Sequence, residues 1–342
     1  MTKKTSQKNS IQDIATALHL SPATVSRVLN KHPHVHDSTR TKVMAMIEQI
    51  GYKRNVMASG LRTNKTNTIG LIVPRLSMFV HAEIITTIQN ALHDHGYRLI
   101  ICQSNDSVEM EKDLAETLYA SRVDAVIAAC TLYTHDFSHF DILIQNNIPV
   151  VFYDRVPLTP YPACIVKGDD FRGAYLATSH LIELGCRNIS YISGPLVSSL
   201  YIERYEGFLS AMSQHLLTVN KELVFYHELT ADNARKTMNR IMTVKPFPDG
   251  IFAANDVTAL SVLGFAKEIG IQVPNDLKIV GYSNDPRSAI ISPSITTIDQ
   301  FPTQIGKVIV QELLKILKTG TPPSPDASPV ITPVELIRRM ST

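Results

Sequence analysis

Residues 21–30 read Ser-Pro-Ala-Thr-Val-Ser-Arg-Val-Leu-Asn. Ser21 is a favoured helix N-cap, and Pro22 suits the first helical position because the N–H that proline lacks is unpaired there anyway. The segment therefore predicts a short helix. Its inward face is apolar: Val25, Val28 and Leu29. Its outward face carries small and polar side chains of a kind that read a DNA major groove: Ala23, Ser26, Arg27 and Asn30.

Two further helices flank this segment. Apolar residues at spacings of three and four predict a helix over residues 10–18 with Ser10 as its cap. A tight turn follows at His19. A third helix is predicted from Ser38 to Ile50, with Gly51 as its left-handed end. Three short helices with a cationic middle member predict a helix-turn-helix head over residues 1–54.

Charge is distributed unevenly along the chain. Residues 1–66 carry 11 Lys+Arg and 3 Asp+Glu, a formal charge of +8, whereas the remaining 276 residues carry 22 bases and 28 acids, or −6. A solvated basic tail is the simple alternative, but residues 11–52 are patterned like folded helices. A basic head on a mildly acidic body is typical of a module that binds nucleic acid phosphates.

The segment over residues 21–30, with Ile50-Gly51-Tyr52 about twenty positions later, resembles the head of the lactose-repressor (LacI) family. The resemblance implies base-edge contacts from Pro22, Ala23 and Arg27. It implies phosphate contacts or helix support from Ser10, Ser21, Thr24, Ser26 and Asn30. The sequence departs from the family at His19, where a turn glycine is usual. It departs again at His36, where a cap serine is usual, so Asp37 or Ser38 is expected to cap instead.

Residues 55–67 contain a short helical pattern and then a polar linker. Taken alone, this segment predicts a flexible tether, because eight residues with a glycine make a marginal helix. The resemblance implies a hinge helix that orders on operator DNA and contacts it through Asn55, Ala58 and Leu61. Leu61 matches a leucine that wedges into the minor groove, and such wedges kink DNA by unstacking a base step.

From residue 68 onward, apolar runs alternate with helical patterns, which predicts βαβ units with parallel sheets. The predicted strands are Ile69–Val73, Arg98–Cys102, Ala125–Ala129, Val150–Tyr153, Ile189–Ile192, Gly250–Ala253 and Leu277–Gly281, with later strands near Ile295–Ile298 and Val330–Ile337. The predicted helices are Ile84–His95, Glu109–Ser121, Gly173–Leu184, Glu203–Gln214, Ala231–Val244, Ala259–Ile269 and Ile305–Lys318. The fold class expected is an all-α head plus an α/β body of two Rossmann-like subdomains.

The resemblance covers nearly the whole chain, with landmarks such as Gly194-Pro195 and Phe252-Ala253-Ala254-Asn255-Asp256 in the family order. It implies a body of the periplasmic-binding-protein-like type over residues 68–342. The expected N-subdomain is about 68–165 plus 299–326, and the expected C-subdomain is about 166–298 plus 327–342. The helix face with Ile84, Ile88 and Leu92 is a candidate dimer surface.

Ligands of open α/β sheets bind beyond the carboxyl ends of the strands. The candidate effector-binding residues there are His81, Asp154, Arg204, Asn255, Ser283, Asn284 and Asp285. Singly, each also suits turn chemistry or helix capping, and Asn255 looks like an N-cap. As a set they suit a polyol, a nucleoside or a carboxylated sugar. The resemblance implies effector contacts for Asp154, Arg204 and Asn255, but Val80-His81 and Leu229 replace family aromatics.

Several function classes are disfavoured. No metal site and no cofactor is expected, and His135 and His139 are read as part of a polar surface helix rather than as ligands. An enzyme is not expected, because no phosphate loop, nucleophile elbow or zinc-protease motif occurs. A transported-solute receptor would carry a signal peptide and lack the basic head. The four cysteines lack metal spacing, which favours reduced thiols and a cytoplasmic protein.

The sequence therefore predicts a DNA-binding transcription regulator, and specifically a repressor. Its expected partners are pseudo-palindromic double-stranded operator DNA, a small polar effector such as a sugar or related metabolite, and a second copy of itself in a homodimer or tetramer. No membrane partner is expected, because no run of 18 apolar residues occurs.

Overall fold

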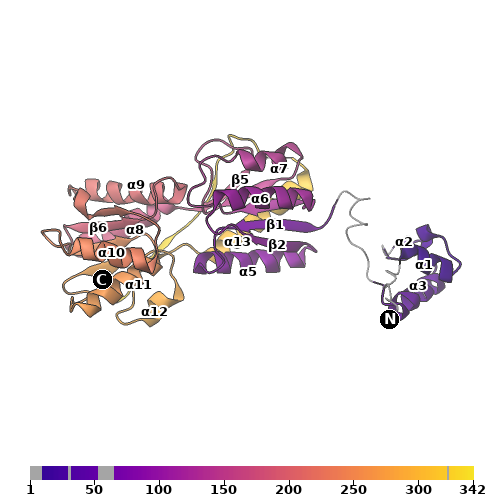
Figure 1. Ribbon diagram of the computed structural model, residues 1–342, viewed down its shortest axis with the longest axis horizontal. Coiled ribbons are helices and arrows are strands. Elements are labelled where there is room, and N and C mark those ends of the chain that lie inside the picture. Colours follow the sequence, from indigo (N-terminus) through magenta and orange to yellow (C-terminus); the bar gives the residue numbers. More distant parts are fainter. Residues whose placement is uncertain (1–9, 30–31, 53–64, 322) are drawn as a thin grey trace, which may run out of the picture. The chain divides into compact units, whose positions relative to one another are not determined.

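The computed structural model describes residues 10–29, 32–52, 65–321 and 323–342. The chain divides into two compact units, residues 1–64 and residues 65–342. Figure 1 shows the helices of the first unit, which we call the head, and the layered sheets and helices of the second, which we call the body.

The described part of the head consists of three helices, α1 (Ile11–Ala17), α2 (Pro22–Leu29) and α3 (Asp37–Gln49). Their core is small. Ile14, Val25 and Val43 are fully buried and Val28 nearly so. The predicted helix-turn-helix head is confirmed, and the second helix begins at the proline that the sequence indicated.

Local side-chain contacts explain where these helices begin. The Ser10 hydroxyl accepts from the backbone N–H of Asp13 at 3.2 Å, and the Asp13 carboxylate accepts from the N–H of Ser10 at 2.7 Å, which is a capping box. The Ser21 hydroxyl likewise accepts from the N–H of Thr24 at 3.1 Å. His19 has a φ of 52°, so the turn does adopt the left-handed conformation that favours glycine.

The prediction for the start of the third helix was wrong. α3 begins at Asp37 and its N-cap is His36 itself, whose Nδ1 accepts from the N–H of Ser38 at 3.4 Å. A histidine ring nitrogen can replace a serine hydroxyl because the cap requires only a suitably placed acceptor.

The first lobe of the body is built on a six-stranded parallel sheet in the order β11-β5-β4-β3-β1-β2. The strands are β1 (Thr68–Val73), β2 (Arg98–Gln103), β3 (Ala125–Ala128), β4 (Val150–Tyr153), β5 (Cys164–Gly168) and β11 (Val330–Thr332). Its helical segments are α5 (Phe79–Asp94), α6 (Val108–Ala120), η1 (Ser138–Phe140), α7 (Asp141–Gln145) and α13 (Pro302–Thr319).

The second lobe has a four-stranded parallel sheet in the order β7-β6-β8-β9. These strands are β6 (Ile189–Ser193), β7 (Val224–Tyr226), β8 (Gly250–Ala253) and β9 (Lys278–Val280), and β10 (Thr297–Asp299) pairs antiparallel with β12 (Glu335–Ile337) nearby. The helical segments are α8 (Asp170–Glu183), α9 (Ser199–Gln214), η2 (Lys221–Leu223), α10 (Ala231–Ile241), α11 (Asp256–Glu268) and α12 (Pro286–Ile290). The predicted α/β body is confirmed.

The chain passes between the lobes three times, after β5, after β10 and between β11 and β12. The single late strand expected over residues 330–337 is in fact two strands. Val330–Thr332 pairs with β5 of the first lobe and Glu335–Ile337 pairs with β10. Residues 330–332 therefore belong to the first lobe, whereas the expected boundary placed them in the second.

Helices cover both faces of the first sheet. α5 and α13 contribute apolar side chains to one face, and α6 and α7 to the other. Strands buried on both faces are apolar along their whole length, which explains the uninterrupted run of β1. The suggestion that Ile84, Ile88 and Leu92 form a dimer surface was wrong, because all three are fully buried in this core.

Among the helices of the described residues, none combines the length and the apolar character that crossing a bilayer requires.

Candidate functional sites: a recognition helix and a two-lobed cleft

The outward face of α2 presents the side chains that the sequence selected. Ser21, Pro22, Ala23 and Arg27 are exposed, and Thr24 and Ser26 are half-buried. Val25 and Val28 anchor the opposite face in the head core. Burial of one face and exposure of the other is the geometry of a recognition helix. Asn30, Asn55, Ala58 and Leu61 lie outside the described residues.

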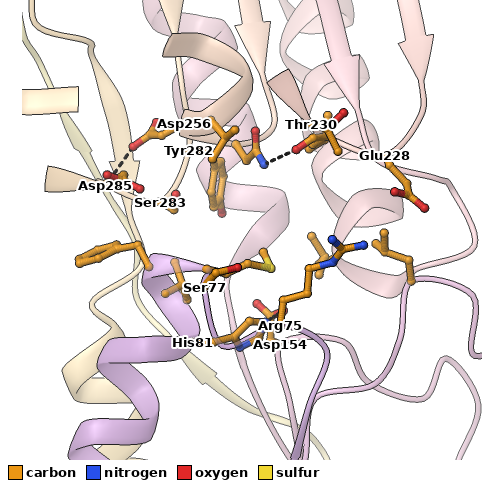
Figure 2. A pocket seen from close by; sticks show the side chains of 18 of the residues that line it. Arg75, Ser77, His81, Asp154, Glu228, Thr230, Asp256, Tyr282, Ser283 and Asp285 are labelled. Atoms are coloured by element: carbon orange, nitrogen blue, oxygen red, sulfur yellow. Dashed lines mark hydrogen bonds and ion pairs between the residues drawn. The ribbon is translucent and has the colours of Figure 1, made fainter. Parts of the chain in front are cut away.

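The body contains a cleft of about 440 Å³ that is lined from both lobes. The first lobe contributes residues that follow β1, β2 and β4, among them Arg75, Ser77, His81, Asp106, Asp154 and Arg155. The second lobe contributes Arg204, Glu228, Thr230, Asn255, Asp256, Tyr282, Ser283 and Asp285, among others. Figure 2 shows His81, Asp154 and Arg75 on one side of the cleft and Asp256, Tyr282 and Thr230 on the other.

The first-lobe side holds a buried histidine beside a carboxylate. His81 on α5 is 1% exposed, and its Nδ1 lies 3.3 Å from the hydroxyl of Tyr153. Its Nε2 is 3.8 Å from Asp154 Oδ2 and has no hydrogen-bond partner among the described residues. Burial lowers the pKa of His81, although the Asp154 carboxylate opposes that shift. The ring is therefore neutral at pH 7.

A buried ion pair supports the second-lobe side. Arg204 on α9 donates through Nε to Asp170 Oδ1 at 2.8 Å and through a terminal nitrogen to the carbonyl of Ala254 at 2.6 Å. Its guanidinium lies 3.6 Å from the centre of the Tyr282 ring. Burial raises the pKa of Asp170 to about 6, and Arg204 limits the rise. Asp170 is therefore ionised at pH 7 and paired.

Asp256 connects the cleft to the loop after β9. Its Oδ2 accepts from the N–H of Asp285 at 2.7 Å, and its Oδ1 accepts from the hydroxyl of Thr297 at 2.7 Å. Asp285 in turn caps α12 and holds Arg287 through both carboxylate oxygens. Burial raises the pKa of Asp256 to about 6.

The structure brings six of the seven candidate effector residues together at the cleft: His81, Asp154, Arg204, Asn255, Ser283 and Asp285. The prediction that Asn284 belongs to this set was wrong. Asn284 does not line the cleft, and its side-chain amide donates to Asp299 and accepts from Arg339. Asn255 lines the cleft, and its side chain caps α11 by accepting from Thr258 N–H, as its N-cap pattern indicated.

Sequence reasoning did not select several of the lining residues, including Arg75, Glu228, Thr230, Arg287 and Gln300. Glu228 and Thr230 follow β7, a strand that was not predicted. The search for polar residues beyond the carboxyl ends of predicted strands therefore did not include them.

The interpretation of His135 and His139 as a polar surface helix was wrong. His139 lies in a short 3₁₀ segment and is mostly buried, and its Nε2 lies 3.0 Å from Oε1 of the fully buried Glu111. Thr131 N–H and the Thr134 hydroxyl also donate to that carboxylate. In the part of the chain that the structure describes, no group of three or more potential metal ligands is assembled.

Replacing Asp256 with asparagine is expected to change how stability depends on pH. In the wild type, the pKa of about 6 in the folded state exceeds the usual value near 4, so stability falls as pH rises from about 4 to 6. Asparagine does not titrate. The variant should therefore gain about 2 kcal/mol relative to wild type between pH 4.5 and 7.5, measured by denaturation of the body.

Asp326→Asn in an exposed loop is the matched control and should give a difference that is flat with pH. A flat difference for Asp256→Asn as well would contradict the assignment of a raised pKa to this carboxyl.

Comparisons with known proteins match both parts of the chain. Residues 10–55 match the family model for bacterial regulatory proteins of the lacI family, and residues 178–342 match the periplasmic binding protein-like domain. The chain is 33% identical over 308 residues to the HTH-type transcriptional repressor PurR of Actinobacillus pleuropneumoniae serotype 3 (strain JL03), covering 90% of this chain and 91% of the relative.

Two solved structures share the fold. The lac repressor dimer bound to operator and the anti-inducer ONPF aligns with a TM-score of 0.86 at 24% identity, covering 98% of this chain and 99% of that one. A complex of the transcriptional regulator CelR with cellobiose aligns with a TM-score of 0.74 at 25% identity, covering 98% and 100%.

A recognition helix joined in one chain to a two-lobed ligand-binding body defines a DNA-binding transcription regulator. The relatives are regulators rather than enzymes, and they extend over most of this chain. The protein belongs to the lacI family of bacterial regulatory proteins.

Proposed function

We propose that this protein is a transcriptional repressor that binds a pseudo-palindromic operator as a homodimer and that a small polar molecule in the cleft controls its affinity for DNA. The observation that carries the proposal is the presence on one chain of an exposed recognition helix and a cleft lined from both lobes. The likeness of its fold to a lac repressor dimer bound to operator supports the assembly. We place the protein in the cytoplasm, with operator DNA, and assign it no catalytic activity.

In the proposed complex, α2 lies in the major groove. Arg27, Pro22 and Ala23 are exposed and approach base edges. The backbone N–H groups at the helix N-termini approach phosphates. The hydroxyl groups near those N-termini do the same, and they belong to Ser10, Ser21, Thr24 and Ser26. Asn30 and the hinge residues Asn55, Ala58 and Leu61 complete the proposed DNA contacts.

The proposed effector site comprises His81, Asp154, Arg204, Asn255, Asp256, Ser283 and Asp285, all of which line the cleft. Contacts already join the lobes beside it. The Tyr133 hydroxyl donates to Glu228 at 2.9 Å, and the N–H of Val156 donates to the Ser199 hydroxyl at 3.1 Å. A ligand that contacts both lobes changes the balance between open and closed forms only by its differential affinity for them, typically about 1–3 kcal/mol.

The test of DNA recognition is an oligonucleotide selection with the full chain, followed by affinity measurements on the selected site and on random DNA. Arg27→Ala should weaken binding to the selected site about 10- to 100-fold and relax the preference at one base pair. Lys42→Ala removes an exposed charge from α3 and should weaken selected and random DNA alike.

Failure to select any sequence would overturn the repressor proposal. An unchanged base preference in Arg27→Ala would instead make Arg27 a phosphate contact and overturn only the docking.

A further inference from the structure

The first residues of the body are held mainly by side chains rather than by the sheet. Thr66 and Asn67 precede β1, and Asn67 has a φ of 50°, so the chain turns sharply just before the strand begins. A residue in this left-handed conformation does not continue an extended strand. The carbonyl of Asn67 still accepts from the N–H of Arg98 at 2.8 Å, but other groups bind the rest of the backbone here.

Asp124 binds this segment through both of its carboxylate oxygens. Oδ1 accepts from the N–H of Thr66 at 2.7 Å, and Oδ2 accepts from the N–H of Asn67 at 2.9 Å. The Thr66 hydroxyl, which also lies 3.0 Å from the carbonyl of Arg122, is 2.9 Å from Oδ1. Hydrogen bonds to a carboxylate are roughly twice as strong as those between neutral groups. One side chain therefore ties two consecutive residues to the loop between α6 and β3.

Arg98 holds the same segment from the other side. Its Nη2 donates to the carbonyl of Thr66 at 3.1 Å and lies 3.3 Å from the hydroxyl of Thr68. In the sheet, β1 lies between β2 and β3. Arg98 begins β2 and Asp124 directly precedes β3, so each strand beside β1 supplies one side chain. We call Arg98 and Asp124 the entry clamp.

The entry clamp and the cleft lie at opposite ends of the first sheet. Residues that follow β1, β2 and β4 line the cleft, whereas the two clamp residues lie where β2 and β3 begin. The clamp is therefore separate from the effector site. It fixes the point at which the chain that comes from the head enters the body.

We propose that Asp124 is a positioning residue for operator binding. Together with Arg98 it sets the length of chain between head and body, and through that length it sets the spacing of operator half-sites that a dimer accepts. The inference rests on the proposed function as a dimeric DNA-binding protein. In a dimer the two entry points are held at one separation, and the chain beyond each point limits the reach of its head. Release of Thr66 and Asn67 adds two residues to that chain in each protomer.

The added length is large on the scale of DNA. Two extended residues span up to ~7 Å, at about 3.3–3.6 Å for each residue. One base pair adds about 3.4 Å along the helix axis and rotates one half-site by about 35° relative to the other. The released residues therefore match a shift of about two base pairs. A clamped dimer should discriminate between spacings, and a released dimer should discriminate much less.

The experiment measures the Kd of the full chain for the selected operator and for duplexes whose half-sites are one or two base pairs closer together or further apart. The wild type should lose at least ~10-fold when two base pairs are inserted. Asp124→Ala removes both acceptor oxygens and should reduce that loss to about two- to threefold. Arg98→Ala breaks the other half of the clamp and should change the spacing profile in the same direction.

Three controls separate the clamp from a general effect on folding. Asp113→Ala removes an equal charge from an exposed position on α6 and should keep the wild-type spacing profile. Inserting two glycines between Lys65 and Thr66 lengthens the chain while the clamp residues stay, and it should reproduce the profile of Asp124→Ala. A duplex with a single half-site should bind every variant alike, because only one head is engaged.

An unchanged spacing profile in Asp124→Ala would overturn the proposal. An equal loss on every duplex, the single half-site included, would do the same, because it would show a merely structural role for Asp124. A wild type that accepts all spacings alike would also overturn it. Failure to select any operator overturns the proposed function instead, so the two failures are distinguishable.

Discussion

Arg204→Ala is expected to lower the free energy of unfolding of the body by about 3–5 kcal/mol, the usual cost of leaving one member of a buried ion pair without its partner. Arg204 is 4% exposed and Asp170 is 3% exposed, so water cannot replace the lost guanidinium. The substitution also removes the donor to the Ala254 carbonyl and the cation stacked on Tyr282. All three losses act on the same wall of the cleft.

The matched control breaks an ion pair at the surface. Arg235 and Glu268 join α10 to α11 at 2.5 Å, and both side chains are more than half exposed. Arg235→Ala should leave the denaturation midpoint unchanged within error, because solvent screens exposed pairs. Equal destabilisation by the two substitutions would mean that the Arg204 pair is no more than a surface contact.

Loss of Arg204 is expected to affect ligand binding through the shape of the cleft. Because Arg204 supports Asp170, Tyr282 and the end of β8, its loss changes the shape of the cleft whether or not the effector touches it. Asp170→Asn is the informative companion, since it removes the carboxylate charge and keeps the side-chain volume. If both variants lose ligand affinity in proportion to stability, Arg204 holds the wall rather than the ligand.

The features that sequence alone predicted well are those fixed by neighbouring residues. Ser21 and Pro22 determine where α2 begins, and His19 and Gly51 occupy the left-handed positions at two turns. Central strands such as β1 are buried on both faces and are apolar throughout, which a pattern search detects directly.

Two strands were missed, for a physical reason. β7 lies at the edge of the second sheet and spans only three residues, and β5, second from the edge of the first sheet, places Lys167 between buried positions. Short and partly polar strands protect sheet edges but leave little periodic signal. Because β7 was missed, the predicted site lacked Glu228 and Thr230, which line the cleft from the loop after β7.

The loop after β9 was also predicted incompletely from the sequence. Ser283 and Asn284 both have positive φ, at 109° and 49°, so the chain turns sharply between two residues that were expected to face the ligand together. Ser283 and Asp285 line the cleft while Asn284 bonds to Arg339 behind it. Non-local contacts of this kind, like that of His139 with Glu111, are not encoded in spacing along the sequence.

Ile14→Ala is expected to abolish tight operator binding while leaving the body intact. Ile14 is fully buried in a head core of only a few side chains. Truncating a buried isoleucine costs about 2–5 kcal/mol, and domains of this size have little stability in reserve. The body forms a separate unit with its own cores, so its melting transition and its response to ligand should match those of the wild type.

The loss of operator affinity can be calculated from the stability of the head, because only the folded head binds DNA. The apparent Kd rises by the reciprocal of the folded fraction, so affinity for the selected operator should fall at least ~100-fold if unfolding is favoured by ~3 kcal/mol. Excess operator should then refold the head and restore its helical circular dichroism signal, by mass action. Met44→Ala on α3, where the side chain is 52% exposed, is the control and should bind as the wild type does. Wild-type affinity in Ile14→Ala would show that the three-helix core does not hold the recognition helix in place.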